Sequence, residues 1–198
     1  MVTASVREWL PEDAAIIRSS GAIVMIHGSM DRQSGFRRLA KSLSRTHRVI
    51  TYDRRGYAGS ADIGGPFDVA HQVSDLLEVM DSQPAVLVGH SYGGAVALAC
   101  ASKYPDLVPG VVVYESPMSW EPWWPKDSGG ARAVAMSEDP RAAAEGFLIR
   151  FIGALPDGRA VMLEGAHHNA HSAEPEAFER LLVRPLLHRV RIGRWPAT

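Results

Sequence analysis

The fold of this chain is decided by the stretch Ala85-Val86-Leu87-Val88-Gly89-His90-Ser91-Tyr92-Gly93-Gly94, which continues into residues 95–104. A short apolar run rich in β-branched residues stops at a glycine, one serine lies between small residues, and an alanine-rich segment follows. Glycine ends the apolar run, and alanine favours helix. The order therefore predicts a buried strand, a sharp turn and a helix.

The turn has the form G-x-S-x-G, written here as Gly89-His90-Ser91-Tyr92-Gly93. A serine in such a turn has a strained backbone, so the residues two before and two after it must lack bulk. Its hydroxyl is exposed at the end of the strand, beside the free backbone N–H groups of the helix N-terminus. This geometry suits a nucleophile, and we predict that Ser91 is one. A glycine-rich turn of this kind is also compatible with a phosphate cradle.

Further apolar runs flank this stretch on both sides. Strands are predicted over residues 22–26, 48–52 and 110–114, because continuous hydrophobicity is typical of parallel strands covered on both faces. Helices are predicted over residues 36–43 and 69–80, where apolar side chains recur at helical spacing. Strands that alternate with helices indicate an α/β fold with a doubly wound, mainly parallel sheet.

Polar residues follow the carboxyl ends of three predicted strands. They are His27, Ser91 and Glu115. In doubly wound folds, ligands bind outside this edge of the sheet. We therefore expect a site there.

Several stretches resemble the α/β-hydrolase family of lipases, esterases and haloperoxidase-like enzymes. They are residues 23–29, residues 52–60, the serine motif, and residues 164–171 followed by Pro175-Glu176-Ala177-Phe178. They occur in the family's order from near residue 22 to near residue 182, so the resemblance covers most of the chain. It implies a minimal, truncated α/β-hydrolase fold with serine hydrolase chemistry.

The resemblance also indicates a general base. A serine hydroxyl becomes a good nucleophile when a histidine takes its proton and a third group orients that histidine. In the family the histidine lies on a loop after the last strand, in a pattern similar to Gly165-Ala166-His167-His168. This implies His168 as the base, with His167 as the alternative one position earlier.

Three clustered histidines, His167, His168 and His171, also raise the question of a metal site. Their loop lacks the helical H-E-x-x-H spacing of zinc enzymes and offers no evident second shell. We therefore expect no metal, and the resemblance implies no organic cofactor. His171 is expected to pack or hydrogen-bond locally, and His90 to be structural.

An oxyanion hole needs two backbone N–H groups directed at the developing negative charge. In the family they come from the residue after the nucleophile and from the loop after an earlier strand. The resemblance thus implies the N–H groups of Tyr92 and Ser29, with Met30 as a substitute for Ser29. His27 is expected to order this loop.

The catalytic acid is where the sequence departs from the family. Most relatives place an aspartate after an additional strand, between the cap and the last strand. Here residues 151–158 join a helix-like segment almost directly to the last predicted strand, residues 158–164, so that strand and its acid are missing. Glu115 is the expected substitute, because a branch resembling haloalkane dehalogenases supplies its acid from the same position. Asp157 is the fallback.

The length of 198 residues suits one domain with a substantial core. We expect a single domain over residues 1–198, with residues 116–157 as a reduced cap-like insertion. Tryptophans in that insertion either line an acyl pocket or pack a loop onto the core; they are Trp120, Trp123 and Trp124. A terminal helix is predicted over residues 173–187.

The composition is ordinary for a globular protein, with 46% hydrophobic residues, 22% charged residues and a net charge of -1. This balance argues against nucleic acid or an acidic membrane surface as a partner. Residues 1–9 contain no apolar signal region, and no segment is long enough to span a bilayer, so a cytoplasmic location without a membrane span is expected. Cys100, the only cysteine, is expected in the core.

Together these features predict a serine hydrolase that acts on a small-molecule ester, thioester or related acyl substrate through Ser91, His168 and Glu115. The alternative is a catalytically impaired relative that binds a ligand, and the missing strand supports it. Loss of a strand also exposes sheet edge and apolar helix surface, so a homodimer is expected.

Overall fold

The computed structural model of the chain describes residues 4–12, 21–116, 159, 161, 163 and 165–190. The chain divides into two compact units, one made of Met1–Ser116 with Ala166–Thr198 and the other of Pro117–Gly165. The helices and strands given below all lie in the first unit. Apart from Ser116, the expected cap-like insertion with its tryptophans lies outside the described residues, as does Asp157.

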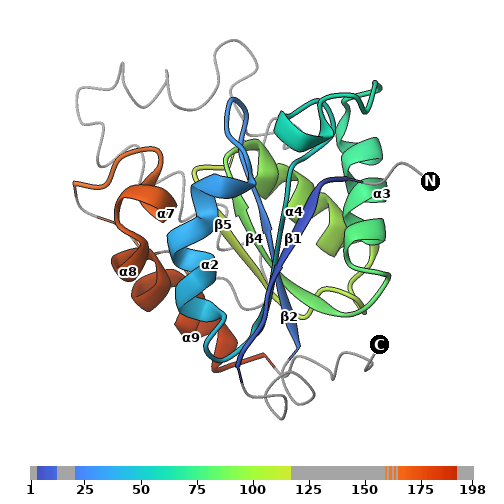
Figure 1. Ribbon diagram of the computed structural model, residues 1–198. Coiled ribbons are helices and arrows are strands. Elements are labelled where there is room, and N and C mark those ends of the chain that lie inside the picture. Colours follow the sequence, from blue (N-terminus) through green and yellow to red (C-terminus); the bar gives the residue numbers. More distant parts are fainter. Residues whose placement is uncertain are drawn as a thin grey trace, which may run out of the picture. The chain divides into compact units, whose positions relative to one another are not determined.

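One mainly parallel sheet forms the centre of this unit, with strand order β1-β3-β2-β4-β5 (Figure 1). β1 is antiparallel to β3, and the other neighbouring pairs are parallel. The strands are β1 (Val6–Trp9), β2 (Ala22–Ile26), β3 (Arg48–Tyr52), β4 (Ala85–His90) and β5 (Val111–Tyr114). The predicted doubly wound α/β fold is confirmed, and four of these strands coincide closely with predicted ones.

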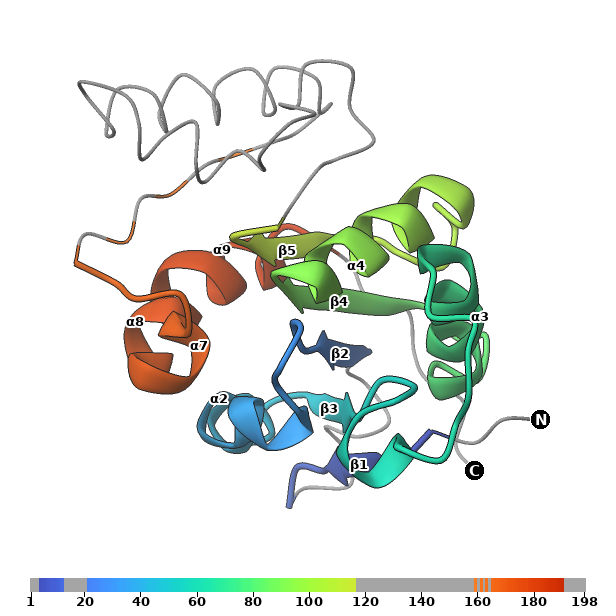
Figure 2. The ribbon, with the colours of Figure 1, turned by 90° about the horizontal axis from the view of Figure 1, so that it is seen from above.

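Helices cover both faces of the sheet. α3 and α4 lie on one face, and α2 lies with the C-terminal helices on the other (Figure 2). The helical elements are η1 (Gln33–Phe36), α2 (Arg37–Leu43), η2 (Ala58–Ser60), α3 (Val69–Val79), α4 (Tyr92–Lys103), α7 (Ala170–Ala173), α8 (Pro175–Phe178), the π-helical η3 (Glu179–Val183) and α9 (Arg184–Leu187).

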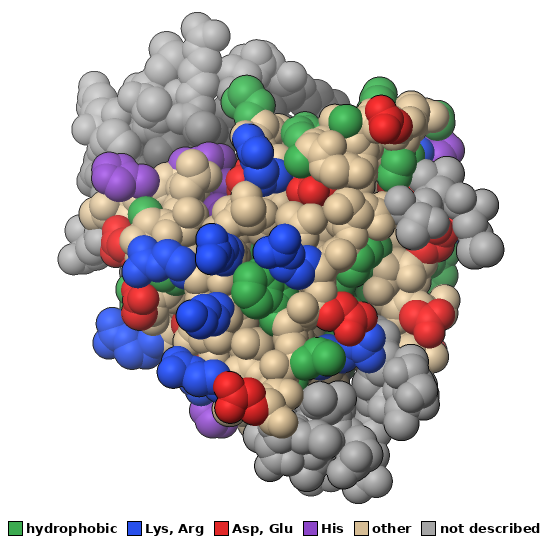
Figure 3. All heavy atoms as spheres, in the orientation of Figure 1, with side chains coloured by type: hydrophobic (Ala, Val, Ile, Leu, Met, Phe, Trp, Pro, Cys, Tyr) green, Lys and Arg blue, Asp and Glu red, His purple; other side chains and the backbone are tan. Residues whose placement is uncertain are grey.

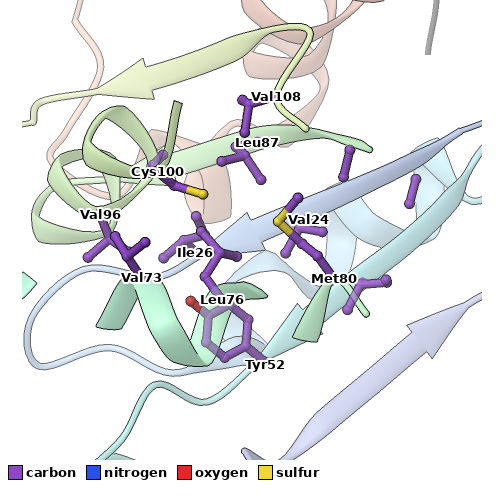
Figure 4. Close-up of a cluster of buried hydrophobic side chains, with 14 of the residues drawn as sticks. Val24, Ile26, Tyr52, Val73, Leu76, Met80, Leu87, Val96, Cys100 and Val108 are labelled. Atoms are coloured by element: carbon purple, nitrogen blue, oxygen red, sulfur yellow. The ribbon is translucent and has the colours of Figure 1, made fainter. Parts of the chain in front are cut away.

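The main core lies between the sheet and the α3–α4 layer. Val24 and Ile26 of β2 pack there in one cluster with Leu76 of α3 and with Val96 and Cys100 of α4 (Figure 4). Successive strand side chains point to opposite faces, so the intervening residues of β2 face the α2 layer, and every β2 residue is fully buried. Burial on both faces is why these strands read as continuous apolar runs.

β1 is a strand that the sequence pattern did not predict. It is an edge strand, and three of its four residues are exposed, so it carries no apolar run. Its place is set by pairing with β3 and by polar contacts: Trp9 Nε1 donates a hydrogen bond to Thr51 Oγ1 (3.2 Å), and Arg48 pairs with Glu8 (2.6 Å).

The C-terminal segment differs in detail from its prediction. Of the strand expected over residues 158–164, the structure describes only Arg159, Val161 and Leu163, and none of these three belongs to a strand. The terminal helix begins at Ala170 and is divided into short helical elements. Proline at the start of α8 and of α9 removes a backbone donor, which interrupts a continuous α-helical ladder.

The surface carries a basic patch over α2 (Figure 3). Arg37, Arg38 and Lys41 are exposed there, and Arg38 pairs with Glu176 at 3.2 Å. A helix with such a charged outer face is solvated on that side. None of the helices in the described residues combines the length and the apolar character needed to cross a membrane.

The strand order places the ends of β2 and β4 side by side. β2 is followed in the chain by β3 on one side of it and later by β4 on the other, and Ile26 is paired with Gly89. This reversal is the switch point at which doubly wound folds bind ligands. The loop after β2 therefore lies beside the turn after β4.

Close packing at this point depends on Gly93. A Cβ atom on Gly93 would collide with the carbonyl oxygen of Ile26 and would lie 2.6 Å from that of His27. We expect Gly93→Ala to lower the free energy of unfolding by about 2–4 kcal/mol, because backbone atoms would have to move. Urea unfolding followed by circular dichroism measures this change.

Gly64→Ala is the matched control, since a Cβ there would meet nothing within 4 Å. It should unfold within about 0.5 kcal/mol of the wild type. Equal unfolding free energies for the two variants would show that β2 and α4 are not in such close contact.

Candidate active site

Ser91 occupies a strained turn between β4 and α4. Its backbone has φ 50° and ψ -124°, a conformation that residues other than glycine rarely adopt. Ser91 N–H donates to the Tyr114 carbonyl (2.8 Å), and Gly94 N–H donates to the Ser91 carbonyl (2.9 Å). These hydrogen bonds hold the turn, and the predicted sequence of strand, sharp turn and helix is confirmed.

Small residues let the elbow fit against its surroundings. A Cβ on Gly89 would lie 2.5 Å from Gly94 Cα, and a Cβ on Gly28 would lie 2.9 Å from Ser91 Cβ. The loop after β2 therefore runs directly alongside the serine. The Ser91 hydroxyl is half-buried and makes no hydrogen bond with any residue in the described part of the chain.

The structure brings together two of the three predicted catalytic side chains. His168 Nδ1 is hydrogen-bonded to Glu115 Oε2. A carboxylate can only accept, so Nδ1 carries the proton and Nε2 is left with a lone pair. Both side chains are substantially exposed, at 57% for His168 and 44% for Glu115. Histidine side chains are visible on the surface beside α7 (Figure 3).

Tyr114 fixes the loop that carries His168. Its hydroxyl donates a hydrogen bond to the His167 carbonyl (2.9 Å). Burial, with a smaller effect from Glu115, raises the pKa of the Tyr114 hydroxyl to about 12, so it remains a donor at neutral pH. His167 thus contributes its backbone, whereas its neighbour His168 is the residue paired with Glu115.

Ser91 and His168 are not joined by a hydrogen bond in the described structure. The ring of His168 lies 4.6 Å from the ring of His90, the residue before the serine. Catalytic hydrogen bonds are often long in structures without substrate and shorten when it binds. The arrangement places His168 next to the elbow, with its partner Glu115 at the adjacent strand end.

The two predicted oxyanion donors line one cavity of about 530 Å³. Within the described residues, the backbone N–H groups of Ser29 and Tyr92 donate to no other group. Both are therefore available to an incoming oxygen atom. The cavity is also lined by Arg54, Arg55, Gly56, Tyr57, Phe67 and Gln72.

Arg54 and His27 shape the loop that contains Ser29. The buried Arg54 side chain donates to the carbonyl groups of His27 (2.8 Å) and Gly28 (3.0 Å). His27 Nε2 accepts the Arg54 backbone N–H (3.0 Å), and its Nδ1 donates to the Gly28 carbonyl (2.8 Å). His27 thus has the ordering role expected of it. Arg54 also lines the cavity, a role that its sequence position gave no reason to predict.

Two buried histidines make stability depend on pH. Burial, with a smaller effect from the Arg54 charge, lowers the pKa of His27 to about 4. Burial and the nearby His171 and His168 lower the pKa of His90 to about 4. Each ring is therefore neutral in the folded protein at neutral pH, whereas it titrates near pH 6.5 in the unfolded chain.

We expect the free energy of unfolding to fall as the pH decreases from about 6.5 to about 4. The unfolded chain binds more protons in this window, so acid favours unfolding, by up to about 3 kcal/mol for each histidine. Urea unfolding across the window measures the effect. A free energy that stays constant between these pH values would mean that both rings bind protons in the folded protein as readily as in the unfolded chain.

Comparison of the sequence with known proteins shows which family the chain is similar to. The sequence profile described as alpha/beta hydrolase fold matches residues 21–134. The mouse sn-1-specific diacylglycerol lipase ABHD11 is 37% identical over 106 residues, which cover 51% of this chain and 34% of the lipase. The bifunctional esterase/perhydrolase DCH of Acinetobacter calcoaceticus is 30% identical over 103 residues, 50% of this chain and 36% of that enzyme. The chain therefore spans about a third of the length of these curated relatives.

Solved structures share the fold. A marine microorganism esterase is 21% identical with a TM-score of 0.50, over 57% of this chain and 41% of the esterase. A mutant epoxide hydrolase from Bacillus megaterium is 19% identical with a TM-score of 0.51, over 58% of this chain and 39% of that chain. The two neighbours catalyse different reactions, so the fold alone does not define the substrate.

Proposed function

The chain belongs to the α/β-hydrolase fold family, and on this premise we propose that it is a serine hydrolase acting on an ester, thioester or related acyl substrate. The observation that carries the proposal is the strained turn at Ser91, which lies beside two backbone N–H groups without acceptors among the described residues. A hydroxyl next to two free donors is the arrangement that acyl transfer requires.

In this proposal Ser91 Oγ attacks the acyl carbonyl carbon while His168 Nε2 takes the hydroxyl proton. Glu115 accepts a hydrogen bond from the Nδ1–H group of His168 and stabilises the imidazolium that forms. The N–H groups of Ser29 and Tyr92 bind the negative oxygen of the tetrahedral intermediate. His168 then protonates the leaving group. In the second half, His168 takes a proton from water, the water oxygen attacks the acyl carbon, and His168 returns the proton to Ser91 Oγ as the acid leaves.

The cavity supplies the binding surface for the acyl group. Tyr57, Phe67 and Tyr92 give it aromatic walls, and the two oxyanion donors lie in the same lining. The lining also contains the polar side chains of Arg54, Arg55 and Gln72, and aromatic walls with directed polar groups are typical of small-molecule sites. The names of two curated relatives, a diacylglycerol lipase and an esterase/perhydrolase, support an acyl substrate.

The second candidate is a hydrolase-fold protein that binds a ligand without efficient turnover. It is favoured by one observation: within the described part of the chain, no hydrogen bond joins Ser91 to His168. Without that contact, the serine lacks the base that makes it reactive.

Labelling with a fluorophosphonate separates the two candidates. Such a probe reacts covalently with serines that are activated by a base, and intact-protein mass spectrometry counts the adducts. We expect one adduct per chain, located on Ser91 by peptide mapping, and none on Ser91→Ala. Ser74→Ala, which removes an exposed hydroxyl from α3, is the control and should be labelled like the wild type. A wild-type protein that stays unlabelled would support the binding protein instead.

A further inference from the structure

Three side chains that the proposed reaction does not use meet beneath the elbow. They are Asp31 from the loop after β2, His90 at the end of β4, and His171 in α7. Each offers one ligand atom, and these atoms all lie within 4.8 Å of one another. The residues are far apart in sequence, so only the fold brings them together.

The two histidines are buried, and Asp31 is a polar neighbour of His171. Each is 1% exposed, and within the described part of the chain neither ring nitrogen of either residue has a hydrogen-bond partner. His171 Nε2 lies 3.4 Å from Asp31 Oδ2, close enough for attraction, but Oδ2 too lacks a hydrogen bond. Buried polar atoms in native proteins are almost always paired, and a water molecule or an ion commonly pairs a group of this kind.

The other ring neighbours of His171 are phenylalanines, and the ring of His90 also lies 4.6 Å from that of His168. The ring of His171 lies 4.4 Å from that of Phe36 and 6.3 Å from that of Phe178. The two histidine rings themselves lie 4.4 Å apart. Aromatic walls exclude water from the sides, whereas the Asp31 side chain is 22% exposed and leaves a route of entry.

From this geometry we propose that Asp31, His90 and His171 bind a divalent transition-metal ion such as zinc. Two imidazoles and one carboxylate are a common ligand set for these ions, and a fourth position remains for water. The cation would accept a lone pair from each ring and neutralise the carboxylate. Magnesium and calcium, which prefer oxygen ligands, are not suited to this set.

The three ligand atoms would need only small movements to form a tetrahedral zinc site. In a tetrahedral zinc site the ligand atoms lie about 3.3 Å apart, and the pair His171 Nε2 and Asp31 Oδ2 is already at 3.4 Å. The other ligand atoms have to approach by at most roughly 1.5 Å, which side-chain rotation supplies. Asp31 is already oriented, because its Oδ1 accepts the Arg32 backbone N–H at 2.7 Å.

The experiment uses the full chain, freed of metal with a chelator and then titrated with zinc chloride. We expect one zinc ion per chain by calorimetry, and an increase in Tm of about 5–10 °C when free zinc is a hundred times its Kd. Cobalt(II) should bind with the visible absorption of a tetrahedral site. Magnesium chloride at the same concentration should leave Tm unchanged.

Two variants test the assignment. His171→Gln should abolish the zinc-dependent rise in Tm, and Asp31→Asn should weaken zinc binding at least about tenfold, because it removes the ligand charge. Asp31→Asn keeps a side-chain oxygen for the Arg32 N–H, so it remains informative if His171→Gln does not fold. His167→Gln on the same loop and His71→Gln on α3 change exposed histidines and should bind zinc like the wild type.

The proposal is overturned if the wild type binds no zinc, since a buried water would then be the occupant. It is also overturned if folded Asp31→Asn and His171→Gln retain wild-type affinity, which would place the ion on surface histidines. These measurements do not depend on hydrolysis, so the metal site and the proposed reaction can fail separately.

Discussion

Ser91→Ala should lower kcat/KM for a short-chain p-nitrophenyl ester by on the order of 10⁴-fold or more. The remaining rate should be that of uncatalysed hydrolysis in buffer plus any residual acceleration by the oxyanion donors. The substitution removes the attacking oxygen and nothing else from the strained turn. Since the Ser91 hydroxyl makes no hydrogen bond in the described structure, its loss should not unfold the protein. Release of p-nitrophenol measures the rate, and thermal unfolding checks that the variant is folded.

Ser74→Ala is the matched control, because it removes a hydroxyl from an exposed position of α3, where alanine favours the helix. It should retain the full rate. If wild type and Ser91→Ala hydrolyse the ester equally fast, Ser91 is not the nucleophile, and the esterase proposal fails.

Glu115→Gln should lower kcat by about 10²- to 10⁴-fold with little change in KM. The amide keeps the size of the side chain but cannot stabilise the imidazolium, and its NH₂ group favours the wrong tautomer of His168. The exposure of the pair places the expected loss toward the lower end of this range. Steady-state kinetics with the same ester separates kcat from KM.

Two carboxylates serve as controls for Glu115. Glu78→Gln changes an exposed position on α3 and should have no effect on kcat. Asp157→Asn tests the fallback acid, and we expect it to lower turnover less than Glu115→Gln does. The reverse order would remove Glu115 from the proposed triad in favour of Asp157.

The sequence predicts the parts of the fold that are buried on both faces. β2 and β3 coincide with their predicted ranges because most of their residues are apolar side chains buried between two helix layers. β1 could not be found in this way, since its exposed residues are held by pairing with β3 and not by burial. The division of the C-terminal helix into α8, η3 and α9 accompanies the prolines at the start of α8 and of α9, which hydrophobic spacing does not take into account.

Some residues of the candidate site could be predicted from the sequence and others could not. Ser91 is predictable because its turn imposes glycine at fixed spacing. Glu115 and His168 are expected from the resemblance to the hydrolase family, and the structure pairs them. The Asp31, His90 and His171 cluster has no sequence signal, because its members come from a loop, a strand and a helix with no fixed spacing. The three histidines that stand close together in the sequence, His167, His168 and His171, share only His171 with this cluster.

The hydrogen bond between Tyr114 and His167 has a consequence for the order of folding. Its two residues are 53 positions apart, whereas β4 and α4, which form the elbow, follow each other directly in the chain. Closing so long a loop costs entropy that local contacts do not. We therefore expect the turn at Ser91 to form early in refolding and His168 to reach it late, so that recovery of the proposed activity would report the docking of the C-terminal helices.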